Sequence, residues 1–300
     1  MSDQQVVMFS GGISSWVVSK RVVARFGAEQ TVLLFADTLI EDEDLYRFLV
    51  EGAANTLGGS PPPIPDIPAV EDIGDAAGFK LRKELIAELA RSAMEAIPGL
   101  QWLIEGRSIW EVFHDERFLA NHRVDPCSKI LKRQLLDSWL EQNCDPAITQ
   151  VAHGFDWSEG HRLDRMRKHD KVWRRWAPLM ERPYLNKDQM CDYANAQGVR
   201  PPRLYELGFV HNNCGGGCVK AGQASWAHLL KTFPKRYEWW ERNEEKMRRF
   251  LGKNVSILDD RRGGTRKPIT LKYFRERLVA ENDFDTSDWG SCGCFQTAES

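Results

Sequence analysis

The chain has 300 residues, of which 42% are hydrophobic and 28% are charged, and its formal net charge is −2. This composition is typical of a globular protein with a sizeable core, in one large domain or two modest ones. The near-neutral charge excludes a global attraction to nucleic acid or anionic lipid, so such binding would need a local patch. We expect a cytoplasmic protein with no membrane partner, because the sequence has no apolar run of spanning length and no signal-peptide pattern.

The first sixty residues alternate between two kinds of element. Residues 6–9 (VVMF) and 31–37 (TVLLFAD) are predicted as buried strands, and residues 14–27 and 41–59 as helices. This order predicts an α/β fold: an open, mainly parallel sheet with helices on both faces and right-handed crossovers.

A loop with five prolines, residues 60–70, ends this alternation. The elements predicted after it are a strand within 148–156 and helices over about 80–97, 128–143, 186–198 and 233–252. Beyond about residue 205 the glycines and cysteines follow no regular period. We therefore divide the chain into an α/β nucleotide-binding domain over 1–205 and an irregular, cysteine-containing helical region over 206–300.

A glycine turn follows the first predicted strand. Gly11 and Gly12 let the backbone approach a ligand closely, and free N–H groups of the next helix would point at the same place. Together with the hydroxyls of Ser10, Ser14 and Ser15, this arrangement favours phosphate binding. A tight turn with a serine cap is an equally good interpretation of so short a motif. The turn is neither a Walker loop nor a three-glycine dinucleotide motif.

The segment "FSGGISS" resembles the pyrophosphatase loop, Ser-Gly-Gly-x-Asp-Ser, of the adenine nucleotide α-hydrolase-like superfamily, the PP-loop ATP pyrophosphatases with a Rossmann-like fold of the HUP type. Further segments are similar, in order, to its phosphoadenylylsulfate (PAPS) reductase-like branch: "LLFADTLIEDEDLYRFL", "EGRSIWEVF", "PCSKILKRQLLDSWL", "GFDWSEGHRLDR" and "PPRLYELGFVHNNCGGGC". The resemblance covers roughly residues 5–220.

The resemblance implies that ATP lies across the carboxyl ends of the strands and is split, with Mg²⁺, into AMP and pyrophosphate. It implies phosphate contacts from the turn and from Lys132 and Arg162, with Lys132 catalytic, and an adenosine near Asp37 and Thr38. The residues expected to bind the nucleotide are Ser10, Gly11, Gly12, Ser14, Ser15, Asp37, Thr38, Gly154, Arg162 and Arg165. Two positions depart from the family pattern: Ser14 replaces the loop aspartate and Asp156 replaces an arginine. These departures permit a protein that binds ATP without chemistry.

Five of the seven cysteines lie in glycine-rich or helix-initiating segments. Cys191 is expected to pack in the core from a helix, whereas Cys144 follows a helix and its sequence context indicates no partner. One interpretation is a [4Fe–4S] cluster on Cys127, Cys214, Cys218 and one of the terminal pair, for which we choose Cys292. The alternatives are a structural Zn²⁺ and a catalytic redox pair, Cys292 and Cys294, that carries persulfide sulfur. Several thiolating relatives of the superfamily use an iron–sulfur cluster, which favours the first.

Residues 161–176 form a basic stretch with seven Lys or Arg, two Asp and two Trp. The part Arg167–Trp176 could bind a nucleic-acid backbone while Trp173 and Trp176 stack on bases. The alternative is a solvated surface with both tryptophans in the core.

Three functions fit these features. The first is an ATP pyrophosphatase that adenylates a substrate for sulfur insertion, on tRNA or DNA, with a cysteine desulfurase as a possible sulfur-donor partner. The second is a sulfonucleotide reductase acting on PAPS or adenylyl sulfate, although "SCGCF" lacks the family's Glu before and His after its Cys-Gly. The third is a non-catalytic ATP-binding subunit of a complex.

Overall fold

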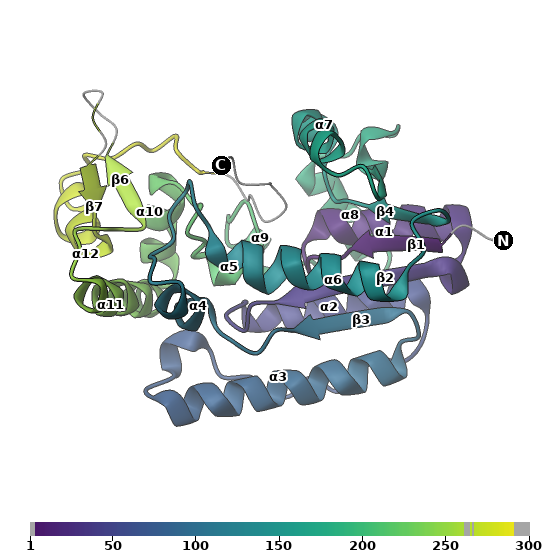
Figure 1. Cartoon of the computed structure of the whole chain (residues 1–300), viewed down its shortest axis with the longest axis horizontal. Coiled ribbons are helices and arrows are strands. Elements are labelled where there is room, and N and C mark those ends of the chain that lie inside the picture. Colours follow the sequence, from purple (N-terminus) through teal and green to yellow (C-terminus); the bar gives the residue numbers. More distant parts are fainter. Residues whose placement is uncertain (1–3, 261–264, 266, 291–300) are drawn as a thin grey trace.

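The computed structural model describes residues 4–260, 265 and 267–290 of the chain. Five strands form one sheet in the spatial order β3-β2-β1-β4-β5, and all neighbouring pairs are parallel (Figure 1). The strands are β1 (Gln4–Met8), β2 (Thr31–Asp37), β3 (Leu100–Ile104), β4 (Thr149–Ala152) and β5 (Arg174–Trp176). The predicted α/β class with a parallel sheet is confirmed.

The strand order places a ligand-binding position beside β1. The chain runs outward from β1 to β2 and β3, and then returns to the other side of β1 for β4 and β5. The order therefore reverses between β1 and β4. Open parallel sheets bind ligands outside the carboxyl ends of their strands at such a reversal.

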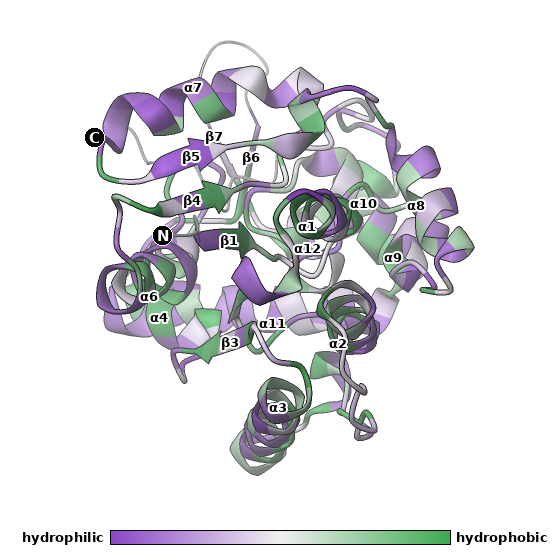
Figure 2. Cartoon of the chain, turned by 90° about the vertical axis from the view of Figure 1, so that its right-hand side faces the viewer, coloured by the Kyte–Doolittle hydropathy of each residue, from purple (hydrophilic) through white to green (hydrophobic). Residues whose placement is uncertain are grey.

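Successive residues of the strands supply two separate cores, because strand side chains alternate between the faces. Val7 and Phe9 pack with the helices α1 (Ile13–Phe26), α2 (Glu43–Leu57), α3 (Ala76–Ala96) and α8 (Lys187–Ala196). Val6 and Met8 pack on the other face, against α6 (Leu135–Asn143). Figure 2 shows α1, α2 and α3 on one side of the sheet and α6 on the opposite side.

The helix that ends in α6 begins much earlier, at the short helix α5 (Pro126–Ser128), and passes through a π-helical turn over Lys129–Gln134. The remaining elements are α4 (Ile109–Asp115), α7 (Gly160–His169), α9 (Arg203–Glu206), α10 (Gln223–Thr232), α11 (Pro234–Leu251), β6 (Leu258–Asp260), β7 (Lys267–Ile269) and α12 (Leu271–Tyr273). Short helical turns connect them.

A further apolar core unites residues from both sides of position 205. Ile109 and Val112 of α4 are buried together with Trp226 of α10 and with Tyr237 and Trp240 of α11. The C-terminal elements therefore share a core with the α4 to α5 part of the chain, next to the sheet (Figure 1).

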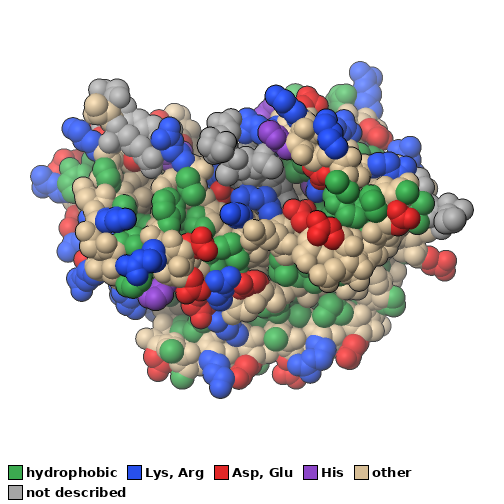
Figure 3. Space-filling model, in the orientation of Figure 1, with side chains coloured by type: hydrophobic (Ala, Val, Ile, Leu, Met, Phe, Trp, Pro, Cys, Tyr) green, Lys and Arg blue, Asp and Glu red, His purple; other side chains and the backbone are tan. Residues whose placement is uncertain are grey.

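Charged side chains of both signs are mixed over the face shown in Figure 3, and Lys, Arg and His side chains gather over α7. Among the helices that the structure describes, none combines the length and the apolarity that crossing a bilayer requires.

Candidate functional site

The glycine turn connects β1 to α1 directly. Gly11 has a φ of 73°, and a Cβ added there would lie 2.9 Å from the Leu45 side chain, so both its conformation and its packing favour glycine. Gly12 is the N-cap residue of α1 and contributes no side-chain cap. The Ser10 amide donates to Ser15 Oγ over 3.1 Å, and Ser15 Oγ donates to the Gly12 carbonyl over 2.8 Å. The Ser15 hydroxyl thus stabilises the turn through hydrogen bonds with Ser10 and Gly12.

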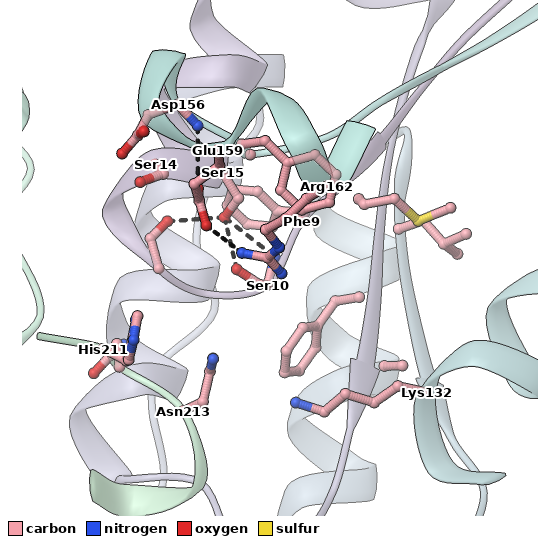
Figure 4. Close-up of a pocket in the computed structure, with 18 of the residues that line it drawn as sticks. Phe9, Ser10, Ser14, Ser15, Lys132, Asp156, Glu159, Arg162, His211 and Asn213 are labelled. Atoms are coloured by element: carbon pink, nitrogen blue, oxygen red, sulfur yellow. Dashed lines mark hydrogen bonds and ion pairs between the residues drawn. The ribbon is translucent and has the colours of Figure 1, made fainter. Parts of the chain in front are cut away.

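A cavity of about 310 Å³ opens at this turn, where the strand order reverses between β1 and β4 (Figure 4). One part of its wall is polar and belongs to the α1 side: Ser10, Gly12, Ser14, Ser15, Lys187, Tyr205, His211 and Asn212. Another part is apolar and includes Met8, Leu34 and Ala36, which pack with Leu136 of α6. The cavity therefore spans the sheet edge and offers two chemically different environments.

Three cationic side chains line the cavity, and each comes from a different segment. Lys187, in the first turn of α8, donates to Ser14 Oγ over 2.5 Å. Arg162 of α7 forms an ion pair with Glu159, and its guanidinium lies 4.5 Å from the Phe155 ring centroid. Arg162 and Glu159 lie beside Ser10 and Ser15 in Figure 4, so this cation shares the polar part of the wall with its carboxylate partner.

Lys132 is the third cation and lies in the π-helical turn before α6. Its side chain is buried, and Nζ is 3.3 Å from Glu41 Oε1. Turns of this kind are frequent at functional sites because they reorient a side chain within a helix. Figure 4 shows Lys132 across the cavity from Ser14 and His211.

His211 contributes a neutral group beside these cations. Desolvation and then the charge of Lys187 lower the pKa of His211 to about 4; Glu159 opposes this shift, and Arg162 adds a smaller lowering effect. The imidazole is therefore uncharged at neutral pH and becomes easier to protonate when an anion neutralises its neighbours.

The loop after β4 closes another side of the cavity. A Cβ added to Gly154 would lie 3.3 Å from the Ser15 amide nitrogen, so the loop approaches α1 closely. Asp156 caps the short helical turn Trp157–Glu159, accepting from the Ser158 amide over 2.9 Å, while Glu159 accepts from the Asp156 amide. The aspartate at this position thus has a local role as a cap.

Not every residue expected at the nucleotide reaches the cavity. Asp37 is fully buried and accepts hydrogen bonds from the Leu39 amide, the Tyr46 hydroxyl and Trp102 Nε1. Burial, followed by the nearby Glu41 charge, raises the pKa of Asp37 to about 6. Arg165 is exposed on α7, away from the residues that line the cavity.

A second, smaller cavity of about 20 Å³ brings three cysteines together. Cys127, Cys214 and Cys218 line it, with Thr38 and Lys132. A hydrogen bond with Cys218, burial and the charge of Glu41 raise the pKa of the Cys214 thiol, so it is protonated at neutral pH.

The three glycines between Cys214 and Cys218 are needed for close packing. A Cβ added to Gly217 would lie 2.2 Å from Trp240 Nε1, and one added to Gly216 would lie 2.6 Å from the Phe209 ring. The turn can lie against these rings only because its glycines have no side chains. In this position Cys214 and Cys218 line the same cavity.

The cysteine set does not form a complete ligand set by itself. Within the parts of the chain that the structure describes, no three or more His, Cys, Asp or Glu side chains are arranged to hold a metal ion. Cys292 and Cys294 lie outside the described residues. Three thiols in one cavity are nevertheless the donor type that zinc and iron–sulfur clusters use.

Lys132 lines both cavities, and its carboxylate partner is Glu41. The Glu41 carboxylate interacts with Lys132 on one side and accepts from Thr38 Oγ1 (2.9 Å) and from the Cys214 amide on the other. The larger cavity and the cysteine cavity therefore meet at one buried ion pair.

The basic stretch is divided between surface and core. Trp173 is buried against Val6 and Met8, and Trp176 is half-buried against Phe26, as the core-packing interpretation predicts. Arg175 is buried in ion pairs with Asp170 and Asp137. The exposed cations of the stretch are Arg165, Arg167, Lys168, Lys171 and Arg174.

Lys187, Tyr205, His211 and Asn212 were not expected at the site. Tyr205, His211 and Asn212 belong to the segment "PPRLYELGFVHNNCGGGC", whose likeness to the family marked it as important. Lys187 follows the helix cap Asn186, and no sequence signal connects it with Ser14, which lies 173 residues away.

The chain matches no protein-family model, and no curated protein matches it at a significant level. Its function is therefore inferred from the residues and their geometry.

Proposed function

We propose that this chain binds ATP at the glycine turn, releases pyrophosphate and adenylates an acceptor that then receives sulfur, with a nucleic acid as the acceptor. Support comes from the two environments of the larger cavity. A helix N-terminus with Lys187, Arg162 and the serines suits the phosphates. The apolar wall of Met8, Leu34 and Leu136 suits a purine.

Each polar group has a defined task in this proposal. The amides of the turn and Lys187 bind the outgoing pyrophosphate, and Arg162 stabilises the negative charge that develops on it. Lys132, on the opposite side, holds the α-phosphate against the acceptor. Mg²⁺ would share the neutralisation of the phosphates, and Asp156 and Glu159 are the carboxylates of the cavity wall that could hold it.

The cysteine cavity would supply the sulfur chemistry. Cys127, Cys214 and Cys218 are the residues of the described chain that would hold a [4Fe–4S] cluster or Zn²⁺, and Cys292 is the proposed fourth ligand. Such a group would stabilise thiolate sulfur at neutral pH, where the Cys214 thiol by itself stays protonated.

The observation that carries this proposal is the position of Lys132, which lines both the nucleotide-sized cavity and the cysteine cavity. An enzyme that couples adenylation to sulfur transfer must bring the adenylate and the sulfur to neighbouring places. The buried Lys132–Glu41 pair is the shared wall between them.

Pyrophosphate release from ATP by the full chain, purified without oxygen and analysed for iron and zinc, tests the proposal. We expect turnover that is lost in Lys132→Met and Lys187→Met, and bound metal that is lost in Cys214→Ser while ATP binding persists. Absence of ATP binding to the wild-type chain would contradict the whole proposal.

The non-catalytic ATP-binding function is the second candidate, and two observations favour it. Ser14 is hydrogen-bonded to Lys187 where an aspartate would be expected, and Asp156 is used as a helix cap. ATP binding with no pyrophosphate release, in the presence of candidate tRNA and DNA acceptors, would support this function. Sulfite release from adenylyl sulfate would instead indicate a sulfonucleotide reductase.

A further inference from the structure

Two large aromatic side chains lie exposed beside the cavity mouth. Trp157 is 60% exposed and Tyr184 is 50% exposed, and their ring centroids are 6.2 Å apart. Rings of this size are normally buried, so an exposed neighbouring pair indicates a contact surface. The guanidinium of Arg182 lies 6.0 Å from the centroid of the Tyr184 ring.

This aromatic pair is attached to the cavity by both of its segments. Asp156 and Ser158, on either side of Trp157, line the cavity, and so does Lys187, three residues after Tyr184. The segment that bears Tyr184 is fixed to α1, because Arg21 donates to the carbonyls of Pro178 (2.8 Å) and Glu181 (3.0 Å). The rings are therefore held at a set place next to the cavity.

The basic helix α7 begins at Gly160, three residues after Trp157. α7 contains four Lys or Arg and a single Asp. Leu163 of α7 is buried against Phe155, whereas His161, Arg165 and Lys168 are exposed at spacings of four and three residues. Such spacings place the three side chains on one face of the helix. Figure 3 shows the positive side chains over α7.

We propose that Trp157, Tyr184 and the exposed face of α7 bind the single-stranded acceptor nucleic acid, with bases stacked on the rings and phosphates along His161, Arg165 and Lys168. This inference rests on the proposed function and names the surface through which its acceptor arrives. Exposed rings bind unpaired bases, since those of a duplex are already stacked, and a basic helix attracts the phosphate backbone. The ring pair would leave the next nucleotide at the cavity mouth, near Ser158.

Binding of a labelled single strand of about 12 nucleotides to the full chain, measured by fluorescence anisotropy without ATP, tests this surface. We expect the double variant Trp157→Ala with Tyr184→Ala to weaken binding about tenfold, and Trp157→Phe to retain most of it because phenylalanine still stacks. Tyr273→Ala is the matched control, since Tyr273 is 51% exposed on α12, far along the chain from the cavity segments. An abasic strand of equal length should bind the wild type and the double variant equally.

The charged face is tested separately by salt titration. Replacing Arg165 and Lys168 by alanine should reduce the slope of log affinity against log salt by about 1–2, because two phosphate contacts are removed. Lys80→Ala with Arg91→Ala, both exposed on α3, removes the same charge elsewhere and should leave the slope unchanged.

Three outcomes would contradict the proposal that this surface binds a single strand. The aromatic double variant could bind the strand as tightly as the wild type does. A duplex could bind as tightly as the single strand, or an acidic peptide could bind more tightly than the oligonucleotide. ATP affinity is measured in parallel and should not change in the aromatic variant. If the wild type binds the oligonucleotide but does not bind ATP, the proposed function is contradicted, whereas the proposed nucleic-acid surface is supported.

Discussion

Lys187 contributes a positive charge to the polar part of the cavity wall. Its ammonium donates to Ser14 Oγ at the first turn of α1 and comes from α8, which packs on α1. The α1 N-terminus already favours an anion, and a lysine beside it adds a full positive charge in a partly enclosed site.

We expect Lys187→Met to weaken ATP binding roughly 10–100-fold, which is the range of one lost charge-assisted hydrogen bond. Isothermal titration calorimetry with the full chain provides the measurement. Lys80→Met is the control, because Lys80 is an exposed lysine of α3. Unchanged ATP affinity in Lys187→Met would remove this cation from the phosphate site.

His211 gives the same site a pH dependence. Its pKa of about 4 reflects partial desolvation and the neighbouring Lys187 and Arg162. A bound anion would offset those charges and raise the pKa, so binding would take up a proton between pH 4 and the higher pKa of the complex. Affinity for the anion should therefore increase as the pH falls through that interval and level off below about pH 4.

Sulfate is the appropriate probe, because it does not titrate in this range. We expect the ring resonances of His211, assigned with a His211→Gln variant and followed by NMR, to titrate at a higher pH when sulfate is present. A midpoint that sulfate leaves unchanged would place the anion away from His211.

At the scale of elements, Arg236 of α11 holds the cysteine turn against the start of α2. Its guanidinium is 2.8 Å from Asp42 and 2.7 Å from Glu71, and it donates to the Gly215 carbonyl over 3.1 Å. Asp42 is completely buried and also caps α2. A single side chain thus connects α11, the acidic first turn of α2 and the glycines between Cys214 and Cys218.

Arg236→Met should lower the free energy of unfolding by about 3–5 kcal/mol, because Glu71 would lose its ion pair with Arg236 and the buried Asp42 would keep only Arg203 as a cationic partner. Denaturant titration followed by circular dichroism gives this quantity. Arg242→Met, on an exposed position of the same helix, should change it by less than about 1 kcal/mol. If the two variants are equally stable, the buried network does not fix the turn as described.

The sequence predicted the elements whose signals are local and missed the contacts that are not. The glycine turn could be located because Gly11 and Gly12 lie between a buried strand and a helix. The family resemblance implied that Asp37 lies near the adenosine, yet its carboxylate is buried and accepts hydrogen bonds from Tyr46 and Trp102. Nothing near residue 187 indicates that its side chain meets Ser14, since that contact exists only after α8 packs on α1.

The same limit applies to strands at the edges of the sheet. β5 lies within the basic stretch, where the many charged residues hide the apolar pattern that would predict a strand. Trp173, just before β5, packs on the face of the sheet that carries Val6 and Met8. Polarity alone could not separate the buried Arg175 from the exposed Arg174. That separation follows from the alternation of β5 side chains once the strand pairs with β4.

At the scale of the whole molecule, the core beside the sheet belongs to both halves of the chain. Leu204 and Cys127 from before residue 205 are buried in it together with Phe209, Trp226 and Trp240 from beyond. A domain that folds alone has its own hydrophobic core. The region 206–300 instead completes a core whose other half is α4 and the loop that leads to α5.

We therefore expect a chain that ends at residue 205 to lose cooperative folding, although it contains the whole parallel sheet and the glycine turn. Its exposed half-core should bind the dye ANS, and thermal unfolding followed by circular dichroism should be broad instead of two-state. The full-length chain is the reference, and a separately produced 206–300 fragment should reduce ANS binding when mixed with 1–205, since it buries the same surface. A sharp two-state transition of 1–205 without ANS binding would show that the sheet domain is independent, and the hydrogen bond from the Cys214 amide to Glu41 would then join two separable units.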